Sequence, residues 1–400
     1  MKKIKQSKQS NKILLKDGRI KTMTGQEFVG SILIEGTKII ALGEQLEVPT
    51  NARVIEAEGN WILPGFIDAH CHVGIGEEIY RLDGDDVNEM TDPLTPEARA
   101  IDGINPEDEG FRDARQGGVT AVFTGPGSGN VIGGTGVVLK TAGKIVDKML
   151  LRDPAGLKVA FGENPKSVYG EQKKMPMTRM GIASLLRQAL IDAQTYQENI
   201  VLGKSDSDKK PERDLGLETL NLVLEHKIPL RAHAHRTDDI MTAIRIAREF
   251  KVDLVIEHCT EGHKIAEELA EYGYPVVVGP SLVNRAKVEL KDKTFKTPGI
   301  LANAGVKVAI MTDHSVTPIE QLPLCAALAV KDGMSVEDAL KAITINPAEI
   351  LGVADRIGSL EVGKDADIVI WSEHPFSLMA RPVYVLIDGK VVRPEGYINS

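Results

Sequence analysis

The hydrophobic positions of this chain fall into three stretches of different texture. Residues 12–56 carry short apolar runs separated by turns, which is the spacing of strands in a small sheet. From Trp61 onward, apolar runs alternate with segments of helical periodicity, of which residues 238–250 are an example. Strand-like runs return at 367–371, 382–387 and 390–392. The two ends of the chain therefore resemble each other and differ from the middle.

The middle stretch predicts parallel strands that are each followed by a helix. The apolar runs that suggest buried strands are 62–67, 119–123, 157–161, 228–231, 254–256, 275–278 and 306–311, with 137–139 as one more. About eight such units over residues 61–352 favour an α/β fold, a (β/α)8 TIM-like barrel, and a doubly wound sheet is the competing arrangement. Residues 1–60 and 353–400 are expected to form one composite β-sandwich domain.

Composition narrows the class of function. The 400 residues include 48 basic and 57 acidic side chains, which gives a net charge of −9. This charge provides no positive electrostatic field that would attract nucleic acid or an anionic membrane. No apolar run is long enough to span a bilayer, and the lysine-rich start is not followed by the apolar region of a secretory signal. We therefore expect a cytoplasmic protein that acts on a small molecule, alone or as a homo-oligomer.

Five of the nine histidines stand at or just after the ends of apolar runs. They are His70 and His72, His233 and His235, and His258, and Asp313 follows the last run in the same way. In a parallel barrel these strand ends share one rim, where barrel enzymes place their chemistry. Each residue alone is better explained as a buried or capping side chain, but the joint pattern predicts a metal site.

The residue types suit Zn²⁺ first, with Mn²⁺, Fe²⁺ or Co²⁺ as alternatives, and one or two ions. A pair of ions needs a bridging anion, for which Glu163 after the run 157–161 is the candidate; the alternative is a carboxylate at the start of a helix. Cys71 and Cys259 each adjoin a histidine, and strand alternation turns them to the opposite side. We expect them to pack behind the ligands, with direct thiolate ligation as the alternative.

These residues resemble the metal-dependent amidohydrolase superfamily, and within it the imidazolonepropionase-like amidohydrolases. The similarity rests on the segment Pro64-Gly65-Phe66-Ile67-Asp68-Ala69-His70-Cys71-His72, on His233, His258 and Asp313 in the same order, and on the closing segment 357–369. The resemblance implies that His70, His72 and Asp313 hold one metal and that His233 and His258 hold a second. Many members bridge the two with a carbamylated lysine, whereas here we expect Glu163 to do so, and a modified lysine is the alternative.

The resulting hypothesis is hydrolysis of an amide-type carbon–nitrogen bond by a metal-bound hydroxide, with Asp313 as general acid and base. The alternative is a deaminase, or a ring-opening hydrolase of the imidazolonepropionase type. Deaminases and imidazolonepropionases of this superfamily tend to carry an acidic residue two or three places after the histidine of the fifth strand. This chain has His235 and Arg236 at those places, a difference that weakens both alternatives without excluding them.

Substrate contacts are predicted from two loops. His235, Lys166, Tyr169 and Arg179 are candidate substrate-binding residues, because the segment 164–179 could clamp a carboxylate. The segment 77–109 is acidic and would favour a cationic group if it lines the site. Together the two loops are compatible with a zwitterionic dipeptide or an N-acyl amino acid.

Overall fold

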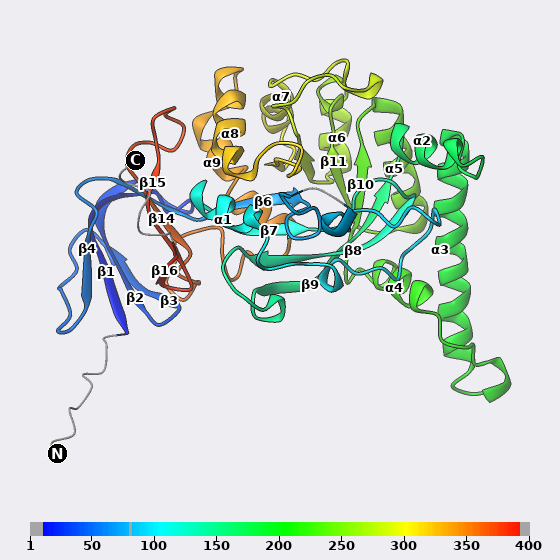
Figure 1. Cartoon of the computed structure of the whole chain (residues 1–400), viewed down its shortest axis with the longest axis horizontal. Coiled ribbons are helices and arrows are strands. Elements are labelled where there is room, and N and C mark those ends of the chain that lie inside the picture. Colours follow the sequence, from blue (N-terminus) through cyan, green and yellow to red (C-terminus); the bar gives the residue numbers. More distant parts are fainter. Residues whose placement is uncertain (1–10, 80–81, 393–400) are drawn as a thin grey trace.

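The computed structural model describes residues 11–79 and 82–392, and it consists of two sheets with helices packed around one of them. Strands from both ends of the chain lie together at one side of the molecule, and the barrel with its helices forms the rest (Figure 1). Among the described residues, no helix is long and apolar enough to cross a membrane.

The first sheet joins the N-terminal and C-terminal strands in the order β16-β15-β14-β5-β1-β2-β3, with β4 beside β1. Its strands are β1 (Lys12–Ile20), β2 (Phe28–Glu35), β3 (Lys38–Gly43), β4 (Arg53–Glu56), β5 (Trp61–Pro64), β14 (Ile368–Trp371), β15 (Pro382–Ile387) and β16 (Lys390–Val391). Isoleucines and leucines from strands of both ends share one buried core. The structure thus has one continuous sheet where we expected a sandwich, and the division of the chain into two domains stays a prediction.

The second sheet is a nearly closed barrel of eight strands in the order β13-β12-β11-β10-β9-β8-β7-β6. The strands are β6 (Phe66–Cys71), β7 (Val119–Thr124), β8 (Ile132–Lys140), β9 (Leu150–Ala160), β10 (Leu230–Ala234), β11 (Leu254–His258), β12 (Val276–Val278) and β13 (Val308–Ile310). The gap between β13 and β6 is spanned just beyond the strands, where His72 N–H donates to His314 O at 2.7 Å. The predicted barrel is confirmed in this coarse form.

Two details of the barrel differ from the sequence prediction. Strand β8 runs antiparallel to both β7 and β9, because segments 125–131 and 141–149 are too short for a helical crossover. The apolar run 62–67 is two strands, β5 in the terminal sheet and β6 in the barrel. They separate at Gly65, where a Cβ atom would lie 2.0 Å from Thr120 Oγ1.

The helices cover the outside of the barrel. They are α1 (Glu109–Gln116), α2 (Glu163–Glu171), α3 (Arg179–Leu202), α4 (Leu215–Leu224), α5 (Thr237–Phe250), α6 (Ala266–Tyr272), α7 (Thr297–Asn303), α8 (Leu322–Lys331), α9 (Val336–Lys341) and α10 (Ile345–Ile350). Short 3-10 helices are η1 (Leu82–Gly84), η2 (Ala100–Asp102), η3 (Val146–Lys148), η4 (Ser207–Lys209), η5 (Gly262–Lys264), η6 (Val288–Leu290) and η7 (Ile319–Gln321). Helix α5 matches the periodic segment 238–250.

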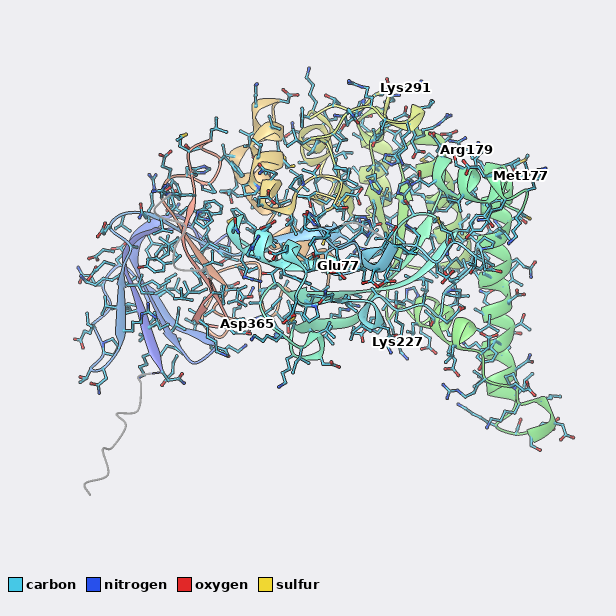
Figure 2. The ribbon with its side chains drawn as sticks, viewed as in Figure 1. Glu77, Met177, Arg179, Lys227, Lys291 and Asp365 are labelled. Carbon is cyan, nitrogen blue, oxygen red and sulfur yellow. The ribbon has the colours of Figure 1, made fainter. Side chains whose placement is uncertain are left out.

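A buried ionic cluster joins the barrel to the terminal sheet. Lys140 ends β8, and its Nζ lies 2.8 Å from Asp365 Oδ2 and 3.1 Å from Asp367 Oδ1, with Asp388 as a third partner. Asp365 lies where the two parts of the molecule meet (Figure 2). The Lys140 side chain is only 4% exposed, so the charges are held where water cannot replace a lost partner.

Candidate active site

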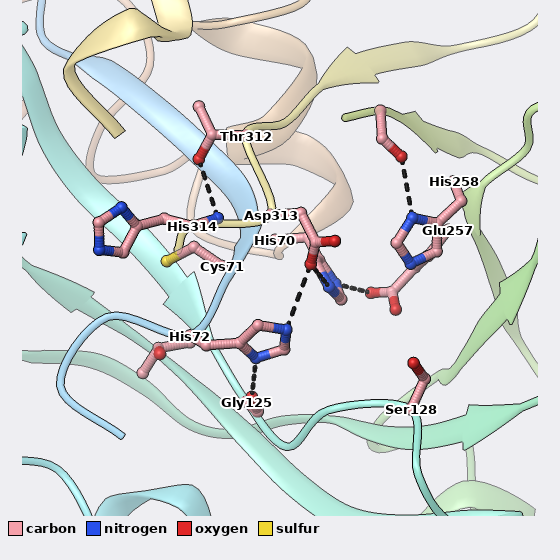
Figure 3. Close-up of polar contacts among 12 residues, drawn as sticks. His70, Cys71, His72, Gly125, Ser128, Glu257, His258, Thr312, Asp313 and His314 are labelled. Atoms are coloured by element: carbon pink, nitrogen blue, oxygen red, sulfur yellow. Dashed lines mark hydrogen bonds and ion pairs between the residues drawn. The ribbon is translucent and has the colours of Figure 1, made fainter. Parts of the chain in front are cut away.

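The predicted histidines converge at one end of the barrel because their strands are parallel and in register. In the register of these two strands, His233 on β10 lies beside Glu257 on β11, and Ala234 lies beside His258. On β10 the residues Leu230, Ala232 and Ala234 pack into the outer core, so alternation turns Arg231 and His233 inward. His70 on β6 and Asp313 just after β13 meet them from the other side (Figure 3).

Two overlapping groups of ligand atoms result. One contains His70, His258 and Asp313, and the other contains His233, His235 and His258; within each group the candidate ligand atoms lie within 4.8 Å of one another. Asp313 Oδ1 is 3.1 Å from His70 Nε2 and 3.2 Å from His72 Nε2. The structure therefore brings together His70, His72, His233, His258 and Asp313, as the spacing predicted.

Backbone carbonyls orient two of the imidazoles. His72 Nδ1 lies 2.7 Å from Gly125 O, and His258 Nδ1 lies 2.9 Å from Gly279 O. A carbonyl oxygen only accepts, so each Nδ1 carries a hydrogen. In the His258 ring, whose pKa burial lowers well below its ordinary value, this leaves the Nε2 lone pair free, whereas His72 Nε2 faces Asp313 Oδ1. This is how proteins prepare histidine for a metal.

Buried polar atoms without partners give a direct test of whether the residues fit a cation. Both ring nitrogens of His233 and Nε2 of His235 are buried and make no hydrogen bond among the described residues, and Oε1 of Glu289, which pairs with Lys287, lies beside them. Burial lowers the pKa of His233 to about 4, so its ring is neutral at pH 7. Neutral nitrogens and a carboxylate oxygen that face one another suit a bound divalent ion.

Asp313 remains ionised in this setting. Burial opposes its charge, but hydrogen bonds from His70 and His72 outweigh that cost and hold the pKa of Asp313 well below its ordinary value. Its φ of 54° lies in the left-handed region, and so does the φ of 68° at His258. Non-glycine residues adopt this conformation at a cost, and such residues cluster at functional sites.

A second buried ionic group lies beneath the histidines, inside the barrel. Glu257 Oε1 is 2.9 Å from His70 Nδ1 and 2.8 Å from Arg231 Nε, and Glu257 Oε2 is 2.5 Å from Lys158 Nζ. Figure 3 shows Glu257 pointing at His70. Glu257 therefore fixes the orientation of the His70 ring and is itself balanced by two cations.

The histidines line a cavity of about 400 Å³. Its other polar lining residues are Asn88, Ser128, Lys158, Asn164, Asn284, Lys287, Asp313 and Ser315. Lys287 Nζ is held 3.0 Å from Asn164 Oδ1, and Asn164 donates to Ser128 Oγ at 2.7 Å. This volume is in the range of small-molecule sites.

Four predicted site residues do not line this cavity. Glu163 is the first residue of α2 and does not line the cavity, although its backbone N–H donates to Glu289 Oε2 at 3.1 Å. The chain bends after β9 at Gly162, whose φ is 85°, so strand alternation does not extend to Glu163. The prediction of Glu163 as the bridging ligand is corrected accordingly.

Lys166, Tyr169 and Arg179 were predicted to contact substrate and do not reach the cavity either. Lys166 lies one turn along α2 from Glu163 and is only partly exposed. Tyr169 is buried with its hydroxyl 2.6 Å from Asn130 Oδ1, and burial raises the pKa of Tyr169 to about 12. Arg179, labelled in Figure 2, is the first residue of α3 and pairs with Asp239 at 2.9 Å, outside the residues that line the cavity. Of the predicted substrate contacts, only His235 faces the cavity.

Two residues that the sequence prediction missed do reach the site. Glu289 in η6 places Oε1 3.5 Å from His235 Nε2 and 3.7 Å from His233 Nε2, and Lys287 Nζ lies 2.8 Å from the same oxygen. Both belong to segment 287–293, in which Val288 and Leu290 are the only apolar residues among charged ones. Their alternation with Val288 was the only available signal.

Comparison with known proteins identifies the family. The amidohydrolase family model matches residues 195–392. A solved amidohydrolase from Thermotoga maritima superposes with a TM-score of 0.92 at 48% identity, over 95% of this chain and 99% of that one. The chain belongs to the amidohydrolase family. It is accordingly a hydrolase of carbon–nitrogen bonds.

Curated relatives of this amidohydrolase extend the comparison. Amidohydrolase tasK of Hapsidospora irregularis is 30% identical over 90% of this chain, which spans 40% of the length of that protein. Imidazolonepropionase of Cupriavidus pinatubonensis is 25% identical, over 85% of this chain and 82% of its own. The resemblance to imidazolonepropionase-like amidohydrolases is thereby confirmed.

The cysteines of the amidohydrolase give a testable consequence of its packing. Cys71, Cys259 and Cys325 are all free and buried, and burial raises the pKa of Cys259 and of Cys325 to about 12. At pH 8 the thiolate fraction of each is then about 10⁻⁴. We expect a thiol reagent to label none of the three in the folded protein and all three in denaturant. Rapid labelling of one thiol in the folded protein would contradict this packing.

The raised pKa values of these thiols also make the stability of the fold depend on pH. The folded state keeps these thiols protonated above 9, the ordinary thiol pKa, so it binds more protons than the unfolded chain between about pH 9 and pH 12. Stability from this source is present below pH 9 and is lost as the pH rises toward 12. Unfolding midpoints at successive pH values measure this loss of stability. We expect Cys325→Ser to lose less stability than wild type over the same pH range.

Proposed function

We propose that this amidohydrolase is a metal-dependent hydrolase of an amide-type bond in a small, carboxylate-bearing substrate, with zinc as the metal. One observation carries the proposal: buried imidazoles and the ionised Asp313 from separate barrel strands face a single cavity of small-molecule size. His70, His72 and Asp313 would hold one ion, and His233 and His258 would hold a second. Bound there, such an ion supplies Lewis acidity toward a carbonyl oxygen and acidifies water.

The proton transfers fall to Asp313. Its depressed pKa keeps it a carboxylate, ready to accept a proton from the water that attacks the carbonyl carbon. As the carbon–nitrogen bond breaks, the same proton passes from Asp313 to the leaving nitrogen. The products are then a carboxylic acid and an amine, and Asp313 returns to its starting state.

Lys158 supports the alternative of a modified lysine as the bridge between two ions. It lies on the cavity wall, whereas Glu163 does not. Its ammonium now pairs with Glu257 at 2.5 Å, and carbamylation would turn this cation into a group with two carboxylate-like oxygens.

The cavity favours an anionic substrate group beside Lys287. Lys287 lines the cavity, is 27% exposed, contacts Asn164 and pairs with Glu289 at 2.8 Å, so its ammonium is held at the cavity wall. An N-acyl amino acid or a dipeptide would place its carboxylate there. Ring opening of an imidazolone is the second candidate, which the similarity to imidazolonepropionases favours.

Substrate choice can be tested with Lys287→Met. We expect wild-type protein to hydrolyse N-acyl amino acids faster than their methyl esters, and the variant to lose about 10- to 100-fold in kcat/KM for the free acids alone, as charge-assisted hydrogen bonds predict. Lys166→Met is the matched control and should behave as wild type. Equal losses on acids and esters would remove Lys287 from this role, and turnover of imidazolones or aminated heterocycles alone would select the second candidate.

A further inference from the structure

His235 and Glu289 face the same point as His233 and His258, and the proposed function leaves both unexplained. We propose that His233, His235, His258 and Glu289 together bind one divalent cation, as a site of three imidazoles and one carboxylate. The inference rests on the proposed function in one respect, namely that this cavity binds divalent ions. It adds His235 and Glu289 as ligands to the two histidines already proposed, which gives four protein ligands.

The three imidazoles are already assembled. Their ring centroids lie 4.2 Å apart for His233 and His258, 4.5 Å for His235 and His258, and 4.7 Å for His233 and His235. His235 Nδ1 is 2.7 Å from Thr260 Oγ1, and His258 Nδ1 is tied to Gly279 O. Each contact directs the Nε2 atom of its ring to the shared interior.

Glu289 supplies the fourth ligand atom. The distances of 3.5 Å and 3.7 Å from its Oε1 to His235 Nε2 and His233 Nε2 are too long for good hydrogen bonds. They are close to the roughly 3.4 Å that separates ligand atoms in a tetrahedral zinc site with bonds of 2.0–2.1 Å. A cation between these atoms would give both Nε2 atoms the partner that they lack among the described residues, while Glu289 Oε1 already faces the Lys287 ammonium.

The carboxylate is fixed in place by its other contacts. Glu289 is 1% exposed, its Oε2 accepts the Glu163 backbone N–H at 3.1 Å, and Lys287 Nζ lies 2.8 Å from Oε1. His235 lines the cavity, but its Nε2 atom is buried and faces Glu289 Oε1 at 3.5 Å. The enclosed position suits an ion better than part of a substrate.

The two proposed metal sites differ in their number of protein ligands. Four protein ligands are typical of closed zinc sites, whereas three leave a position for water or substrate. His70, His72 and Asp313 are three. The four-ligand site would therefore hold its ion more permanently, and the open position would lie at Asp313.

Metal content measures this directly. The full chain is freed of metal with a chelator, reloaded with Zn²⁺, passed through a desalting column and analysed for zinc per chain. We expect two ions in wild type and about one in Glu289→Gln and in His235→Gln, with binding of the lost ion weakened more than about 100-fold in chelator competition. Glu163→Gln is the matched control and should keep two, because only its backbone N–H contacts Glu289. Glu289→Asp should recover part of the affinity, and Co²⁺ absorption should change in the two Gln variants but not in the control.

The outcomes separate the two claims. If Glu289→Gln and His235→Gln are folded by circular dichroism and retain two ions with wild-type affinity, the ligand assignment is overturned while the proposed function stands. If wild type binds no divalent ion, the proposed function fails, and this inference with it.

Discussion

Asp313→Asn is expected to lower kcat by about 10²- to 10⁴-fold, the usual range for losing a general acid and base. The amide has nearly the shape of the carboxylate but cannot accept the proton of the attacking water. The hydrogen bonds that now keep Asp313 ionised come from His70 and His72, so the geometry of the pocket should change little. Rates are measured at saturating Zn²⁺, with the bound metal counted in the same sample.

Metal content distinguishes a chemical role from a structural one. Asp313 is also a proposed ligand, so a variant that merely binds its ion more weakly would regain activity as Zn²⁺ is raised. We expect no such recovery. Glu163→Gln should stay within about threefold of wild type, since its side chain lies off the cavity. Full turnover of Asp313→Asn with normal metal content would exclude Asp313 from proton transfer.

Lys140→Met is expected to lower the free energy of unfolding by about 3–5 kcal/mol, the range for removing one partner from a buried ionic group. Three aspartates face the Lys140 ammonium, and two of them, Asp365 and Asp367, are nearly fully buried. Without the ammonium their charges would be left together in a poorly solvated place. Burial already raises the pKa of Asp367 to about 6 with Lys140 present.

Lys38→Met is the matched control for this loss of stability. Lys38 contacts the same Asp365 at 2.7 Å, but its side chain is 45% exposed, so its removal should cost less than about 1 kcal/mol. Denaturant unfolding followed by tryptophan fluorescence reports on the junction, because Trp61 and Trp371 both lie in the terminal sheet. Equal effects of the two substitutions would show that burial of the Lys140 cluster does not govern this junction.

The sequence predicts the histidine positions well because two local rules suffice for them. Each follows an apolar run, and strand alternation selects the inward side, so His233 and His258 could be placed without knowing their neighbours. Cys71 and Cys259 are buried in the outer cores, as the same alternation predicted. The side chains that the sequence prediction missed depend on what happens after a strand ends.

Glu163 and Glu289 show why such residues cannot be assigned locally. Glu163 follows an apolar run just as His258 does, but the chain turns at Gly162 and Glu163 is not among the residues that line the cavity. Glu289 lies in a 3-10 helix beyond β12, and only the folded chain brings it to within 3.7 Å of His233. The direction of β8 was missed for a related reason, since an apolar run shows that a strand is buried and not which way it runs.

The central claim, a metal-dependent hydrolytic centre at the end of the barrel, is tested most directly by amine release from N-acyl amino acids and dipeptides. Wild type and Asp313→Asn are each assayed after chelation and after reloading with Zn²⁺. The account predicts full turnover by reloaded wild type alone, with reloaded Asp313→Asn slower by about 10²- to 10⁴-fold. Equal turnover by the chelated wild-type protein, or by reloaded Asp313→Asn, would contradict it.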